Sequence, residues 1–113
     1  NSKKSLIDSA KDYVHRNYRS VDLGLDDTCK ELGVSNSYFS SLFKKETGSS
    51  FVEYLTDYRM DKAARMLVET DDKSYVIAQN VGYADPNYFS YVFKRKYGVS
   101  PSRYRTEYEK NKV

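Results

Sequence analysis

Hydrophobic residues recur every three or four positions along most of this chain, which is the spacing of an amphipathic α-helix. An early stretch places its apolar residues on one helical face: Leu6, Ile7, Ala10, Tyr13 and Val14. The longest run covers residues 51–68, with one face formed by Phe51, Tyr54, Leu55, Tyr58, Ala63, Met66 and Leu67. Alternation with a period of two, which is typical of strands, is absent. The pattern predicts an all-α fold of about seven helices.

Glycines and capping residues divide the other helices into two similar units. In the first unit a short helix ends at Gly33, Ser35 caps the next helix, and that helix ends at Gly48. The second unit repeats these signals at Gly82, Asp85, Pro86 and Gly98. The second helix of each unit should bury three residues, namely Phe39, Leu42 and Phe43 in the first and Phe89, Val92 and Phe93 in the second. A last short helix should begin at Pro101.

The two units also have similar amino-acid sequences. Residues 37–48 are SYFSSLFKKETG and residues 87–98 are NYFSYVFKRKYG, and eight of the seventeen positions in 38–54 are identical to those in 88–104. A helical solenoid would need about three such repeats to close its core. Two copies instead favour a pair of helix-turn-helix units, residues 1–50 and 69–113, joined by a helix over residues 51–68.

The outward face of each second helix suggests contact with DNA. Short polar groups near the helix N-terminus are suited to base edges in a major groove, and they are Asn36, Ser37, Ser40 and Ser41 in the first unit and Pro86, Asn87, Ser90 and Tyr91 in the second. Cations further along each helix are candidate phosphate contacts: Lys44, Lys45, Lys94 and Arg95. The alternative is that both faces are simply solvated.

Charge is concentrated in the second unit. The net charge is +3, but residues 1–85 hold 12 Lys/Arg and 14 Asp/Glu, whereas residues 86–113 hold 7 and 2. A basic patch attracts nucleic acid, anionic membrane or an acidic protein. The asymmetry predicts that the second unit contributes more of the affinity for DNA.

Three arginines and several tyrosines have two interpretations. Arg59, Arg103 and Arg105 are either phosphate contacts or structural residues that pair with an acid such as Asp57, Asp61 or Glu107. Four tyrosines are expected in or beside the core: Tyr54, Tyr58, Tyr88 and Tyr104. Tyr91 is expected to point outward, where it would pack on a thymine methyl group or reach a phosphate.

The sequence offers few residues suited to catalysis. His15 is the single histidine and is expected at the surface, and Cys29 lacks a neighbouring base or second ligand. We therefore expect no catalytic residues, no metal and no cofactor. One cysteine fits a reducing, cytoplasmic setting, no signal peptide or membrane span is evident, and the missing initiator Met indicates a fragment of a longer protein.

The chain resembles the DNA-binding domain of AraC/XylS-family transcription regulators. The resemblance rests on VGYADPNYFSYVFKRKYGVSPSRYR (81–105), LGVSNSYFSSLFKKETGSSFVEYL (32–55) and YRMDKAARML (58–67), and it is strongest to members fused to two-component receiver or sensor modules. It departs at Cys29, where the family usually has Ala. The resemblance implies seven helices, base contacts at the outward residues named above, double-stranded DNA and RNA polymerase as partners, and a dimeric parent with a monomeric fragment.

We therefore predict a bacterial transcription regulator that recognises double-stranded DNA. A central helix would hold the two recognition helices about 34 Å apart, in successive major grooves. The alternative is a helical protein-interaction module whose basic tail binds an acidic partner.

Overall fold

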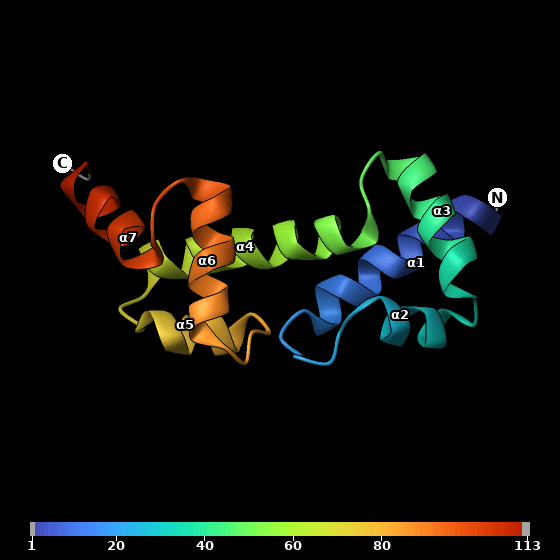
Figure 1. Cartoon of the computed structure of the whole chain (residues 1–113), viewed down its shortest axis with the longest axis horizontal. Coiled ribbons are helices and arrows are strands. Elements are labelled where there is room, and N and C mark those ends of the chain that lie inside the picture. The colour runs from blue at the N-terminus through green and yellow to red at the C-terminus, as the bar shows by residue number, and fades with distance from the viewer. Residues whose placement is uncertain (1, 112–113) are drawn as a thin grey trace. The chain divides into compact units, whose positions relative to one another are not determined.

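The computed structural model describes residues 2–111, with side chains from Ser5 onward. Within this range the chain forms seven α-helices and no strands, which confirms the predicted all-α fold (Figure 1). The helices are α1 (Ser2–Asn17), α2 (Leu25–Leu32), α3 (Asn36–Thr47), α4 (Phe51–Glu69), α5 (Ser74–Asn80), α6 (Pro86–Tyr97) and α7 (Pro101–Lys110). None of the helices described is long and apolar enough to cross a membrane.

The chain divides into two compact units. The first ends at Tyr58 and the second begins at Arg59, so the boundary falls inside α4, the helix predicted over residues 51–68. Each unit therefore contains part of α4 together with its own helix-turn-helix pair, α2 and α3 in the first and α5 and α6 in the second.

Helices α1, α2 and α3 contact one another in the first unit. Their core includes the inward residues predicted for α3, Phe39, Leu42 and Phe43, all of which are buried. The rings of Phe39 and Phe43 each lie about 5.5 Å from Phe51 at the start of α4, in edge-on geometry. Edge-to-face aromatic pairs add about 0.5–1.5 kcal/mol beyond the area they bury, so this cluster fixes α3 against α4 and α1.

The second unit repeats this arrangement with α5, α6 and α7. Helix α6 contacts both α5 and α7, and it buries Phe89 and Phe93 fully while Val92 is half-buried. Phe93 packs against Tyr97 at 4.6 Å and against Tyr104 of α7 at 5.4 Å. The paired phenylalanines orient α6 in its unit as Phe39 and Phe43 orient α3, so the opposite side of each helix faces solvent.

Capping contacts set where both recognition helices begin and end. The Ser35 hydroxyl accepts from the Tyr38 amide at 3.2 Å, and the Asp85 carboxylate accepts from the Asn87 amide at 2.9 Å, which confirms both predicted N-caps. Gly48 and Gly98 follow the helices with φ of 84° and 82°. A side chain is strained in this left-handed conformation, so glycine lets the chain turn sharply into the next helix.

Candidate nucleic-acid interface

The polar residues predicted on α3 share its solvent-facing side. Asn36, Ser37 and Ser41 are exposed and Ser40 is half-buried. Ser37 and Ser41 lie opposite Phe39 and the other core residues of the helix, whereas Asn36 and Ser40 lie at the edge of the exposed face, because residues three positions apart lie close on a helix. The first turn of α3 also carries backbone N–H groups without helical partners, which favour an anion or a base acceptor.

The corresponding residues of α6 lie in the same way. Pro86, Asn87 and Tyr91 are exposed, and Ser90 is half-buried like Ser40. Each predicted set is therefore brought together on one face of its own helix, and the two faces occupy equivalent positions in two equivalent units.

Asn36 is oriented by a neighbouring helix. Its side-chain amide donates to the Asp26 carboxylate in the first turn of α2. This contact uses one of the two N–H donors of the amide group and leaves the other donor and the carbonyl oxygen for other partners. In the second unit Tyr75 occupies the place equivalent to Asp26, and the start of α6 instead carries the Asp85 carboxylate as its N-cap.

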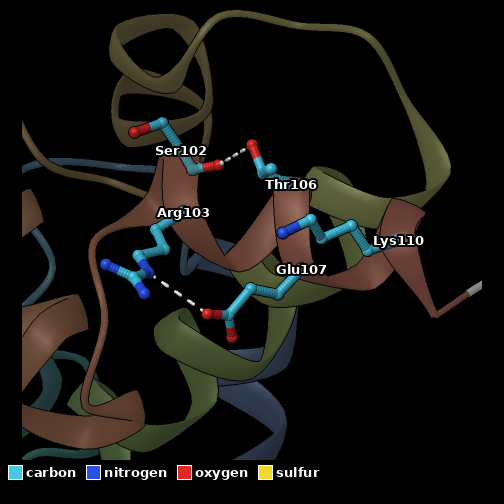
Figure 2. A pocket seen from close by; sticks show the side chains of 5 residues that line it. All are labelled: Ser102, Arg103, Thr106, Glu107 and Lys110. Atoms are coloured by element: carbon cyan, nitrogen blue, oxygen red, sulfur yellow. Dashed lines mark hydrogen bonds and ion pairs between the residues drawn. The ribbon is translucent and has the colours of Figure 1, made fainter.

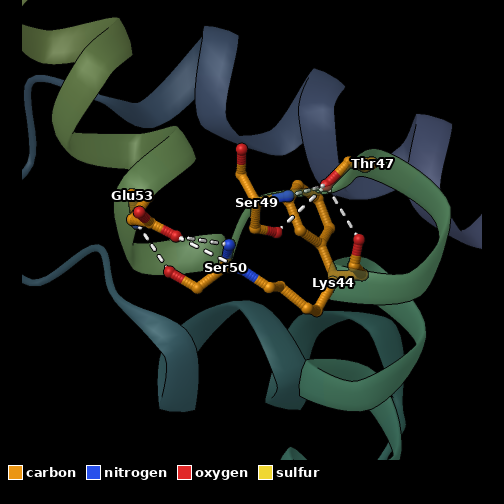
Figure 3. Close-up of polar contacts among 6 residues, drawn as sticks. Lys44, Thr47, Ser49, Ser50 and Glu53 are labelled. Atoms are coloured by element: carbon orange, nitrogen blue, oxygen red, sulfur yellow. Dashed lines mark hydrogen bonds and ion pairs between the residues drawn. The ribbon is translucent and has the colours of Figure 1, made fainter.

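The cations of the two helices have different surroundings. Lys44 lies 3.9 Å from Glu53 at the start of α4, and both side chains are largely exposed (Figure 3). In α6 the Arg95 guanidinium lies 5.8 Å from the centre of the Tyr91 ring and donates to the Tyr91 hydroxyl at 3.2 Å. Lys96 pairs with Asp61 at 2.9 Å. Lys45, Lys94 and Arg95 are exposed to solvent.

The three arginines with two interpretations, Arg59, Arg103 and Arg105, make contacts inside the second unit. Arg59 is only 7% exposed and lies over the Tyr83 ring at 5.5 Å, and burial lowers the pKa of its guanidinium. Arg105 donates to the carbonyl oxygens of Leu67 at 2.8 Å and Thr70 at 3.0 Å, so it binds the C-terminal end of α4. These contacts favour the structural interpretation for Arg59 and Arg105.

Arg103 lies on the exposed side of α7. Figure 2 shows it in a surface depression lined by Ser102, Arg103, Thr106, Glu107 and Lys110. Its guanidinium pairs with Glu107 at 3.1 Å, one turn away. An exposed pair of this kind contributes little to stability, so Arg103 could exchange Glu107 for a phosphate at small cost.

Comparisons with known proteins agree with this geometry. A family model described as a helix-turn-helix domain matches residues 28–107. The C-terminal domain of the two-component response regulator yesN from Fusobacterium nucleatum superposes with a TM-score of 0.85 at 36% identity, covering 93% of this chain and 99% of that one. The chain belongs to the AraC/XylS family of helix-turn-helix DNA-binding domains.

Two other members of the AraC/XylS family indicate the kind of protein that contains such a domain. The C-terminal domain of AraT, a response regulator from Geobacillus stearothermophilus, has a TM-score of 0.88 and 39% identity, covering 90% of this chain and 84% of that one. The lactose operon transcription activator of Staphylococcus xylosus is 36% identical over 80 residues, which is 71% of this chain. This chain spans 28% of that activator's length.

The structure corrects one expectation about the tyrosines of this AraC/XylS domain. Tyr88 was expected in or beside the core, but it is 56% exposed, and Tyr38 at the equivalent position is 50% exposed. Each immediately precedes a buried phenylalanine, so it is rotated by about 100° from the core on the helix. That rotation is predictable from the sequence. The partial stacking of Tyr88 on Tyr91, with ring centres 6.2 Å apart, is not predictable from the sequence.

His15 and Cys29, the two residues considered for catalysis, make structural contacts. His15 is exposed, stacks on Tyr58 at 4.6 Å and contacts the Tyr54 hydroxyl at 2.9 Å. Cys29 is 2% exposed, and burial raises the pKa of its thiol. Among residues 2–111, no group of three or more His, Cys, Asp or Glu side chains is placed to hold a metal ion.

Proposed function

We propose that this chain is the sequence-specific double-stranded DNA-binding part of a bacterial transcription regulator. The observation that carries the proposal is the paired arrangement of α3 and α6. Both helices bury the same two phenylalanine positions, begin at a side-chain cap, and expose a polar N-terminal half followed by cations.

Each recognition helix would enter a major groove with its N-terminus leading. Asn36, Ser37, Ser40 and Ser41 of α3, and Pro86, Asn87, Ser90 and Tyr91 of α6, would then face base edges, where each good bidentate contact contributes about 1–3 kcal/mol of discrimination. Asn36 and Asn87 are the side chains in this set suited to adenine, because an amide both donates and accepts, and Asn36 already donates one N–H to Asp26. Small serines would allow the backbone of α3 to approach the groove closely.

Lys44, Lys45, Lys94 and Arg95 would bind phosphates, and Arg103 would join them by releasing Glu107. Such contacts add affinity without sequence preference and weaken as salt displaces them. Arg59 and Arg105, which were also candidates for phosphate contact, are left out of the proposed set because their side chains serve the core and the end of α4.

The experiment that tests this function is a selection of bound sequences from randomised duplex DNA, with the 113-residue chain at near-physiological salt. We expect two enriched blocks about one helical turn apart, one for each recognition helix. A single block would assign base recognition to one unit and phosphate contact to the other. Binding to no duplex, even at low salt, would contradict the proposal and favour the protein-interaction alternative.

Variants assign each block to its helix. Asn87→Ala should relax the sequence preference in one block only, whereas Lys94→Ala should weaken all duplexes alike. Ser37→Ala is the matched variant on α3, since Ser37 occupies the position equivalent to Asn87. It should change the other block.

The remaining proposals concern the longer protein of which this chain would be part. Because similar domains occur in response regulators and in an operon activator, we propose that a separate module senses the signal, that the parent dimerises through it, and that RNA polymerase is a partner in activation. The fragment would bind DNA as a monomer. Sedimentation of the chain alone and with its selected duplex tests the last point: two copies on one duplex would contradict it.

A further inference from the structure

The centre of the exposed face differs between the two recognition helices. With about 100° of rotation per residue, Tyr91 lies directly opposite the midpoint of Phe89 and Phe93, and Ser41 is its equivalent in α3. The cores are the same, yet one helix places a small hydroxyl at this point and the other a large ring that is 56% exposed. A residue opposite the core is the one that faces the floor of a groove when the helix enters it.

The Tyr91 ring is held in place on the surface. It stacks partly on Tyr88 with ring centres 6.2 Å apart and planes inclined by 29°, and the Arg95 guanidinium lies over it at 5.8 Å. The hydroxyl already accepts a hydrogen bond from Arg95. A side chain fixed from two sides loses little freedom on binding, and what it offers to a partner is chiefly the apolar edge and face of its ring.

The neighbours of the ring define the partner. Lys94 and Arg95 are exposed beside it, so the surface is an apolar centre next to cations, which complements a groove bounded by phosphates. The apolar group that a major groove presents at a base edge is the C5-methyl of thymine. We propose that α6 selects a thymine by packing its methyl group against the Tyr91 ring, with Tyr88 supporting that ring.

This inference rests on the proposed function, and it is tested by removing the methyl group alone. Each thymine of the duplex selected by the 113-residue chain is replaced in turn by deoxyuridine, which keeps every hydrogen-bonding group. Affinity is measured by fluorescence anisotropy. We expect about a fourfold loss at one thymine of the block assigned to α6, the effect of burying one methyl-sized group, and smaller losses elsewhere.

Three variants separate the ring from other causes. Tyr91→Ser, which copies Ser41, should bind thymine and deoxyuridine duplexes equally. Tyr91→Phe keeps the ring and should keep the fourfold difference. Tyr108→Ser removes another exposed tyrosine of the same unit and should behave like the unchanged chain. Thermal unfolding of each variant checks that it folds.

Two results would overturn the inference and leave the proposed function intact. One is a selected duplex with no position sensitive to deoxyuridine, and the other is a sensitivity that persists in Tyr91→Ser. A chain that selects no sequence at all would remove the proposed function together with this inference.

Discussion

At the scale of single residues, burial separates side chains that the sequence leaves equivalent. Arg59, Lys94 and Arg95 are all cations on helices, but Arg59 is buried over Tyr83 whereas the other two are exposed on α6. Composition does not report this difference. Spacing does place Arg59 between Leu55 and Ala63 on the apolar face of α4, but the Tyr83 ring that its guanidinium contacts is known only from the fold.

Replacing Arg59 should affect stability and not DNA binding. Arg59→Ala removes a buried stem and a guanidinium–ring contact, so we expect the free energy of unfolding to fall by about 1–2 kcal/mol. Arg65→Ala, an exposed position on the same helix, should change it by less than about 0.5 kcal/mol. Urea unfolding measures both. Unchanged stability together with a weaker salt dependence of DNA binding would instead assign Arg59 to a phosphate.

At the scale of elements, the start of α4 is fixed by a capping box. The Glu53 carboxylate accepts from the Ser50 amide at 2.9 Å, and the Ser50 hydroxyl accepts from the Glu53 amide at 3.1 Å (Figure 3). Reciprocal contacts of this kind satisfy two amides that the helix leaves unpaired. Helix α7 begins with the cap at Ser100 alone, where Arg103 stands in place of the glutamate.

The capping box predicts a pH dependence of stability. The hydrogen bond from the Ser50 amide, followed by the Ser50 hydroxyl and Lys44, lowers the pKa of Glu53 below its ordinary value of 4.5. A carboxyl whose pKa is lowered by folding stabilises the fold above its unfolded pKa, and this contribution is lost as pH falls through the folded pKa. Thermal melts from pH 7 to pH 3 should therefore show a larger loss for the unchanged chain than for Glu53→Gln. Parallel losses would contradict the role of the charge.

Charge on the two recognition helices predicts unequal contributions to affinity. At equivalent positions α3 carries Lys44, Lys45 and Glu46 whereas α6 carries Lys94, Arg95 and Lys96, and Glu53 also lies next to Lys44. We expect the double variant Lys94→Gln/Arg95→Gln to weaken binding to random duplex more than Lys44→Gln/Lys45→Gln, by severalfold at low salt. Each double variant removes two charges, so equal losses of DNA affinity in titrations would contradict this prediction.

Most of the elements were predictable because their signals are local. Gly33, Ser35, Gly48 and Asp85 mark helix ends through contacts within four residues of themselves, and the burial of the predicted α3 and α6 phenylalanines follows from spacing. The Ser100 cap was not predicted, although a serine directly before Pro101 is a local signal of the same kind as Ser35. Contacts between distant residues, such as Arg105 with the end of α4, need the tertiary structure and have no local signature.

At the scale of the whole molecule, DNA affinity should depend on salt in proportion to the cations proposed to meet phosphates. Five such cations, Lys44, Lys45, Lys94, Arg95 and Arg103, give an expected slope of about −4 to −5 in a plot of log K against log salt concentration. Filter binding between about 50 and 200 mM salt measures it. A slope near zero would contradict phosphate contact, and a slope twice as steep would bring further cations into the interface.

The exposed faces of α3 and α6 differ at Ser41 and Tyr91, and also at Asn36 and Pro86 and at Ser37 and Asn87, which has a consequence for how a site is laid out on a chromosome. If both helices presented the same side chains, the two halves of a site would have the same base sequence. This chain has unlike ends, so its site has a polarity, and the same bases inverted are a different address.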